Sequence, residues 1–291
     1  MLFSIINVYR QMGSLSVISL YSISCGSQSV LIVGFCLSLG VKIPMLPVHL
    51  WLPQAHVEAP LVGSVLLAGI LLKLGGYGLI RFVIPIFSDG IKEAKPILVS
   101  LSLLAIVYAG LIALSQADLK RLIAYSSISH MGIVTLSLMT QSLEGFLAAI
   151  LVMLSHGLIS SSLFIGVTCL YERTHSRTIR IHSGVSVCMP LLSTLFFVMT
   201  LANTGAPGTL NFLGEYLAFY AFMSSSNSPC LWLIVLSSIV VCASYSFKLY
   251  TSVFFGATPK NFIYLRDLDR KEFFSVFVLT VTTVFLGVWP D

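Results

Sequence analysis

A succession of long apolar runs constrains the fold of this chain more than any other feature. Of its 291 residues 57% are hydrophobic and only 9% are charged, and the mean hydropathy is +0.97. A helix crosses a bilayer with roughly 20 apolar residues, whereas a membrane β-barrel is built of short alternating segments. The continuous runs therefore predict an all-α polytopic membrane protein, one membrane domain over residues 1–291, with about nine transmembrane helices, at 3–24, 28–52, 60–86, 96–115, 121–139, 145–170, 190–222, 230–256 and 272–289.

The basic residues gather in one set of alternate loops. The net charge is +5, which in another setting would suggest nucleic-acid binding. Sorting the loops alternately onto two sides puts ten basic residues on one side and three on the other. Such an excess marks the matrix or cytoplasmic side of a membrane protein, so no nucleic-acid partner is expected, and the C-terminus should be external. The basic side collects Arg10, Lys120, Arg121, Arg173, Arg177, Arg180, Lys260, Arg266, Arg270 and Lys271, and the other side Arg81, Lys92 and Lys95.

Lys73 stands at the midpoint of the 60–86 run, too deep for its ammonium group to reach water along its own stem. Ionisable residues at that depth face a polar interior and are usually functional. Burial favours the neutral amine and a nearby carboxylate favours the ammonium, so a movable acidic partner would let Lys73 exchange protons. The alternative is a lysine that only locks helix packing. The position favours a role in proton transfer.

Prolines predict that two of the helices are broken. Lys42 comes just before three closely spaced prolines, Pro44, Pro47 and Pro53, and each proline removes an N–H and clashes with the preceding turn. Pro207 lies near the middle of the overlong 190–222 run, and Glu215 follows it. Broken helices at membrane depth line cavities or ion sites, and a pair of them is typical of inverted-repeat transporters. We therefore expect Lys42 and Glu215 beside the two breaks, with a packing kink and a helix-capping role as the alternatives.

Two histidines lie near the centres of consecutive runs, His130 in 121–139 and His156 in 145–170. Because helices joined by a short turn run antiparallel, both imidazoles should lie at a similar depth. Imidazole titrates near neutral pH, so the pair could share a water chain with Lys73. An isolated histidine on an apolar face would instead be a satisfied core residue.

No metal site is predicted. The six cysteines are separated by at least eleven residues, so no C-x-x-C pair exists. His49 and His56 flank Trp51 without a third ligand nearby in sequence. Lys248 lies off-centre in its apolar run. Its ammonium group is expected either to reach the membrane surface along its own stem or to take a minor part in proton transfer.

Four segments carry a resemblance to a known family, at 42–82, 116–131, 153–161 and 171–177. They resemble the antiporter-like chain 4 family in the membrane arm of respiratory complex I, the proton-pumping NADH:ubiquinone oxidoreductase. The likeness implies an antiporter-like fold of two inverted repeats, with the remainder of the first repeat at 28–86, the second at 96–256 and a final helix at 272–289. It also implies that Lys42, Lys73, His130, His156 and Glu215 translocate protons.

The resemblance extends to cofactors, partners and location. It implies no cofactor in this chain, with NADH, FMN, iron–sulfur clusters and ubiquinone elsewhere in the complex. It implies a multi-pass place in the mitochondrial inner membrane, with a bacterial plasma membrane as the alternative, and chains 2 and 5 of the complex as neighbours. Met1 aligns near the family's sixth helix, so we expect a separate chain to supply the N-terminal helices and an acidic partner for Lys42.

Three functions compete at this point. The first is a proton-translocating subunit of complex I, either whole or as one fragment of a split subunit. Such a subunit is part of an NADH:ubiquinone reductase but carries out no redox chemistry itself. The second is a subunit of a monovalent cation/proton antiporter, against which the 171–177 segment argues. The third is a non-pumping scaffold of the membrane arm, against which the buried ionisable residues argue.

Overall fold

The computed structural model describes residues 1–13, 28–226, 228–258 and 265–290. In these residues every regular element is a helix, apart from one β-bridge that joins Asp118 to Thr178. The predicted all-α class is therefore confirmed. The later part of the expected 3–24 helix, Cys25 and Lys260 lie outside the described residues.

Long helices and short helical pieces alternate along the chain. Within the described ranges, five helices are long and apolar enough to cross a membrane, namely Leu61–Ile86, Ser88–Ser115, Leu143–Thr174, Pro229–Phe254 and Arg270–Val288. The elements are α1 (Leu2–Met12), α3 (Gln28–Lys42), α4 (Trp51–Glu58), α5 (Leu61–Leu66), η1 (Leu67–Leu71), α6 (Leu72–Gly78), η2 (Leu79–Val83), α7 (Ile84–Ile86), α8 (Ser88–Ser115), α9 (Leu119–Leu138), α10 (Leu143–Thr174), η3 (Ile179–Ile181), α11 (Val185–Cys188), α12 (Pro190–Asn203), α13 (Leu210–Ser225), α14 (Pro229–Phe254) and α15 (Arg270–Val288).

Two boundaries differ from the sequence prediction. The helix expected from Pro96 begins at Ser88, because its first turns are polar and hydropathy marks only where the apolar part starts. Pro53 does not contribute to the first break, since it lies in the first turn of α4, where a missing N–H costs no helical hydrogen bond.

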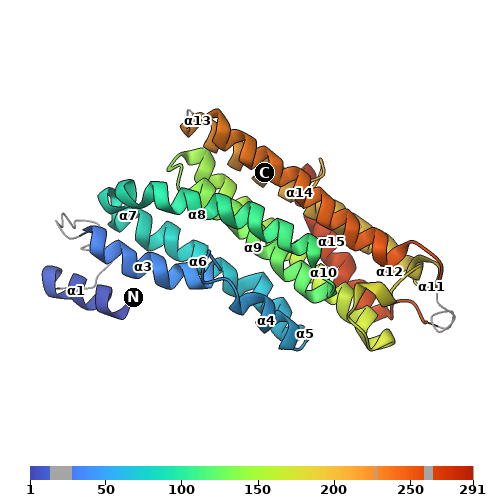
Figure 1. Ribbon diagram of the computed structural model, residues 1–291. Coiled ribbons are helices and arrows are strands. Elements are labelled where there is room, and N and C mark those ends of the chain that lie inside the picture. Colours follow the sequence, from blue (N-terminus) through green and yellow to red (C-terminus); the bar gives the residue numbers. More distant parts are fainter. Residues whose placement is uncertain (14–27, 227, 259–264, 291) are drawn as a thin grey trace.

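The helices run side by side along one common direction (Figure 1). In Figure 1, α3 and α6 lie on one side of the central pair α8 and α9, and α12, α14 and α15 lie on the other. The C-terminal end of α1 lies at the same end of the bundle as α7, and Val8 lines one pocket with Phe87, just before α8. Arg10, in the last turn of α1, therefore belongs to the end of the bundle at which α8 begins, which differs from its predicted grouping with Arg173.

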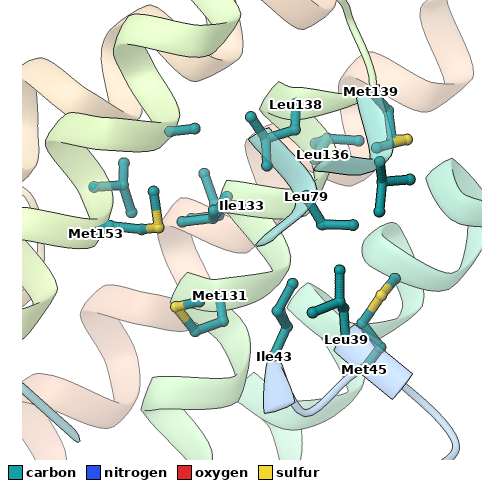
Figure 2. Packing of buried hydrophobic residues seen from close by; sticks show 14 of the residues in the cluster. Leu39, Ile43, Met45, Leu79, Met131, Ile133, Leu136, Leu138, Met139 and Met153 are labelled. Carbon is teal, nitrogen blue, oxygen red and sulfur yellow. The ribbon is translucent and has the colours of Figure 1, made fainter. Parts of the chain in front are cut away.

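Helix α9 forms the centre of the bundle. All of its residues are buried except Arg121 and Tyr125. A helix that is apolar on all sides and carries small hydroxyl residues packs on several neighbours at once. Figure 2 shows part of the resulting core, in which side chains from α3, η2, α9 and α10 meet, among them Leu39, Ile43, Leu79, Met131, Ile133 and Met153.

The first helix break separates α3 from α4 over residues 43–50. Pro44 has a φ of 27°, and Pro47 follows three residues later. Two hydrogen bonds span the break: Met45 donates its N–H to the Gly40 carbonyl at 2.8 Å, and the Trp51 indole donates to the Val41 carbonyl at 3.0 Å. The break predicted at Pro44 and Pro47 is thus present and internally bonded.

The second helix break separates α12 from α13 over residues 204–209 and contains Pro207. Gly205 has a φ of 70°, a left-handed conformation that costs glycine little. A Cβ at this position would lie only 2.8 Å from Oε2 of Glu215. Glycine therefore lets the broken backbone fold back against the carboxylate of Glu215.

Two π-helical turns interrupt the helix that carries Lys73. The segment η1 ends two residues before Lys73 and η2 begins six residues after it. A π-turn shifts backbone carbonyl groups out of the regular α-helical hydrogen-bond pattern and occurs frequently at functional sites. The sequence contains no proline between Leu61 and Val83, so it does not predict these π-helical turns.

Arg173 joins the ends of three elements at the basic end of the bundle. Its guanidinium donates to Oε1 and Oε2 of Glu272, at 3.2 and 2.6 Å, and to the carbonyls of Cys169, Arg266 and Asp267. The carboxylate of Asp267 in turn accepts the N–H groups of Leu191 and Leu192 at the start of α12. One arginine thereby holds α10, α15 and the chain that leads into α15.

Replacing Arg173 with alanine is expected to destabilise this end of the bundle by about 3 kcal/mol, because the half-buried Glu272 loses its bidentate partner. The measurement is thermal unfolding of the detergent-solubilised chain. Arg266→Ala is the control, since the side chain of Arg266 is exposed and only its carbonyl contacts Arg173. Equal melting temperatures for the two variants would contradict the assigned role.

Candidate functional site

Four of the five ionisable residues singled out in the sequence form one continuous line inside the bundle. Lys73 lies on α6, His156 on α10, His130 on α9 and Glu215 on α13. His130, His156 and Glu215 are buried, with 2%, 3% and 6% of their surface exposed. The line thus connects the helix of the two π-turns with the helix that follows the second break.

The first link joins Lys73 to His156. Nζ of Lys73 lies 2.9 Å from Nδ1 of His156 and also donates to the carbonyl of Ala68, a residue within η1. The displaced carbonyl of a π-turn thereby serves as an acceptor for the lysine. Two positive charges at 2.9 Å would repel strongly, so a proton on one group disfavours a proton on the other.

The second link joins the two imidazole rings. The ring centroids of His130 and His156 are 5.6 Å apart, and the planes are inclined by 45°. The predicted common depth of the two histidines therefore agrees with their position in space. The structure shows no direct hydrogen bond between these two rings, so a proton passing between them would need an intervening polar group or water.

The third link joins His130 to Glu215. Nδ1 of His130 lies 3.1 Å from Oε1 of Glu215, an ion-pair distance, although the ring N–H is not aligned for a hydrogen bond. The Asn211 amide donates to the same oxygen at 2.7 Å, and the hydroxyl of Ser155 donates to Oδ1 of Asn211 at 2.9 Å. Asn211 and Ser155 therefore fix the carboxylate that faces His130.

The opposite edge of His130 faces polar residues that the sequence analysis did not identify. Nε2 of His130 lies 3.4 Å from the hydroxyl of Tyr245 and 3.9 Å from Sγ of Cys242, both on α14. The hydroxyl and the thiol are 3.0 Å apart, and the thiol donates to the carbonyl of Asn203 beside the second break. A tyrosine hydroxyl can donate to the neutral imidazole and accept from the protonated one. The spacing of Cys242 and Tyr245, three residues apart in an apolar helix, was the available signal.

Lys42 is not part of this line. It ends α3 at the first break and is exposed, and it makes no hydrogen bond or ion pair with any described residue. It lies near the line all the same, because a Cβ on Gly75 would approach Cβ of Lys42 to 3.2 Å. The structure thus places Lys42 beside the helix of Lys73 with its charge directed outward.

His49 and His56 are buried, with 4% and 0% of their surface exposed. Their ring nitrogens have no hydrogen-bond partner, and the ring of His56 stacks on Phe164 at 4.5 Å. Searched over the described residues, the chain contains no group of three His, Cys, Asp or Glu side chains that could hold a metal ion. His49 and His56 are thus two separate buried rings, each packed against an aromatic side chain.

The arrangement can pass protons between titratable groups. An amine, two imidazoles and a carboxylate follow one another at short range, and each can bind and release a proton. Two broken helices border the group, as in transport proteins with discontinuous helices. Fold and site together define an antiporter-like membrane protein.

The chain belongs to the family described as NADH:quinone oxidoreductase/Mrp antiporter, transmembrane, whose model matches residues 1–242. It is 44% identical to NADH-ubiquinone oxidoreductase chain 4 of Metridium senile, over all of this chain and 59% of the relative. It thus spans about three fifths of the length of the curated relatives it matches.

Solved structures share the fold. A chain of respiratory complex I from Thermus thermophilus superposes with a TM-score of 0.91 at 26% identity, covering 100% of this chain and 62% of that one. A chain of the Mrp complex from Dietzia superposes with a TM-score of 0.90 at 18% identity, covering 99% of this chain and 62% of that one. The second likeness is one of fold alone.

Proposed function

We propose that this chain is a proton-translocating part of the membrane arm of respiratory complex I. The observation that carries the proposal is the line Lys73, His156, His130 and Glu215, in which successive groups are 2.9 Å, 5.6 Å (ring centroids) and 3.1 Å apart. A scaffold would have no need of four ionisable side chains in the bundle interior, where each is costly. Similarity to the chain 4 relatives supports complex I rather than a separate antiporter.

In this function the chain carries no redox step. Electron transfer from NADH to ubiquinone takes place on cofactors held by other subunits, and this chain moves protons in response. The proposed location is the inner membrane of mitochondria, which is supported by relatives that are subunits of NADH-ubiquinone oxidoreductase in an animal, an alga and a plant. Complex I chains 2 and 5 are the proposed neighbours.

Lys42 requires an acidic partner from outside the described residues. An exposed ammonium at a helix break is costly in lipid unless a carboxylate faces it. We propose that a transmembrane helix with an intramembrane glutamate, on a separate polypeptide, covers this face. Chemical crosslinking from a cysteine placed at Val41 tests this, and recovery of lipid alone on that face would exclude the partner.

Native electrophoresis of the membrane, combined with mass spectrometry, tests the proposed function. The chain is expected to migrate with NADH dehydrogenase activity. Migration in a smaller complex without that activity would overturn the proposal and favour the cation/proton antiporter. If complex I contains this chain and still pumps fully after Lys73 or Glu215 is replaced by a residue that cannot titrate, the scaffold function would be favoured.

Replacing Tyr245 with phenylalanine is expected to slow NADH-driven proton pumping roughly tenfold, because Nε2 of His130 loses the hydroxyl that can donate to it or accept from it. The pH profile of turnover should shift as well, which a purely structural defect would not cause. Tyr250→Phe is the matched control, since that buried hydroxyl pairs with Ser193 and not with His130. An unchanged pH profile in Tyr245→Phe would exclude a positioning role for Tyr245.

A further inference from the structure

A pocket at the end of the bundle opposite Arg173 combines apolar walls with two lysines. It has a volume of about 300 Å³, and the ends of four helices surround it: the start of α8, the end of α9, the end of α13 and the start of α14. Lys92 and Lys95 line it together with three hydroxyl residues, Thr140, Ser225 and Ser226. The walls are Pro96, Val99, Leu136, Met139, Phe222 and Leu231.

The pocket lies at the depth of the lipid headgroups. Helices that cross a membrane end at its interface, and two of the helices long and apolar enough to do so, α8 and α14, begin at this pocket. Trp232 is beside the pocket and donates its indole N–H to the carbonyl and hydroxyl of Ser226, at 3.0 and 2.8 Å. Tryptophan concentrates at the membrane–water interface, so the pocket opens where phosphate groups lie above acyl chains.

The two lysines are available to an anion. Lys95 is half-buried and makes no hydrogen bond or ion pair with a described residue. Lys92 pairs with Asp89 at 2.9 Å, and both side chains are about 70% exposed. Such an exposed ion pair contributes little to stability, so another anion can replace Asp89 as the partner of Lys92. No acidic residue lines the pocket. Ammonium groups above an apolar cavity match a phosphodiester above acyl chains.

We propose that this pocket binds an anionic phospholipid, with its phosphate between Lys92 and Lys95 and an acyl chain against Val99 and Leu231. The bound lipid joins α8 to α14 at the membrane surface. The site is separate from the line of ionisable residues and does not depend on the proposed function.

Native mass spectrometry of the purified membrane assembly that contains the full chain tests this proposal. After delipidation the assembly is mixed with phosphatidylglycerol or phosphatidylcholine, and the lipid retained is counted. Each lysine near an anionic headgroup favours binding about fivefold, so Lys92→Gln with Lys95→Gln should lower retention of phosphatidylglycerol roughly 30-fold. Val99→Trp, which fills the cavity without changing charge, should lower it too. Lys271→Gln, an exposed lysine at the other end, should not.

Several results would overturn the proposal. Parental retention by the double lysine variant is one, and equal retention of phosphatidylcholine by the parent is another. Displacement of the lipid by inorganic phosphate alone would show an anion site without a lipid. Loss of a protein subunit from the lysine variant, with lipid retention unchanged, would show a protein interface instead.

Discussion

Replacing Lys73 with methionine is expected to lower NADH:ubiquinone turnover of the assembled complex roughly 100-fold, the scale on which a positioned proton-transfer group acts. The amine links the displaced Ala68 carbonyl to Nδ1 of His156, and methionine fills similar space without a titratable group. Assembly should survive, because Lys73 makes no ion pair in the described part of the chain that its removal would leave unmatched. The measurement is the rate of NADH oxidation with ubiquinone in membranes that contain equal amounts of complex.

Lys248→Met is the matched control for Lys73→Met. Lys248 also donates to a backbone carbonyl, that of Leu114, but it lies on the outer face of α14, away from the line. Its replacement should leave turnover within a factor of about two, as for surface substitutions in general. Equal losses in both variants would mean that any lysine on these helices matters only for assembly.

Glu215→Gln is expected to cause a loss of turnover of roughly 100-fold as well. The substitution keeps the shape of the side chain and its contact with Asn211, but it removes the negative charge 3.1 Å from Nδ1 of His130. Without that charge a proton on His130 loses its counter-ion, so the terminal exchange of the line stops. The measurement is turnover between pH 6 and pH 8, the range in which a free imidazole titrates.

Glu144→Gln controls for the loss of one negative charge from the chain. Glu144 is exposed in the first turn of α10 and has no contact with the line. Normal turnover in Glu215→Gln across the whole pH range would exclude a titrating role for Glu215. Normal turnover in Glu144→Gln, together with a slow Glu215→Gln, is the result expected.

Proline and charge patterns predicted the main features of the fold. Pro44, Pro47 and Pro207 each lie in a helix break, because a residue without an N–H in mid-helix leaves few alternatives. Lys73 and Glu215 were visible as charges in apolar runs, where they are rare. The sequence also placed His130 and His156 at one depth, and they lie 5.6 Å apart.

Other features depend on how helices rotate against each other, which hydropathy does not encode. Tyr245 and Cys242 reach His130 only because α14 turns that face inward, and nearly every face of α14 is apolar enough for lipid. The contact of Asn211 with Glu215 could not be predicted for the same reason. The π-turns on either side of Lys73 leave no mark in hydropathy, and the glycines at 75, 76 and 78 between them let α3 and α10 come close. Lys42 looked like a member of the line, but it is the last residue of α3 and its side chain is exposed.

The number of protons translocated per electron, measured in vesicles that contain the Lys73→Met complex, tests the central claim most directly. If the line from Lys73 to Glu215 carries protons, the residual electron transfer should be accompanied by fewer protons per electron than in the parent or in Lys248→Met. A fully assembled Lys73→Met complex that pumps with the parental ratio would contradict the account.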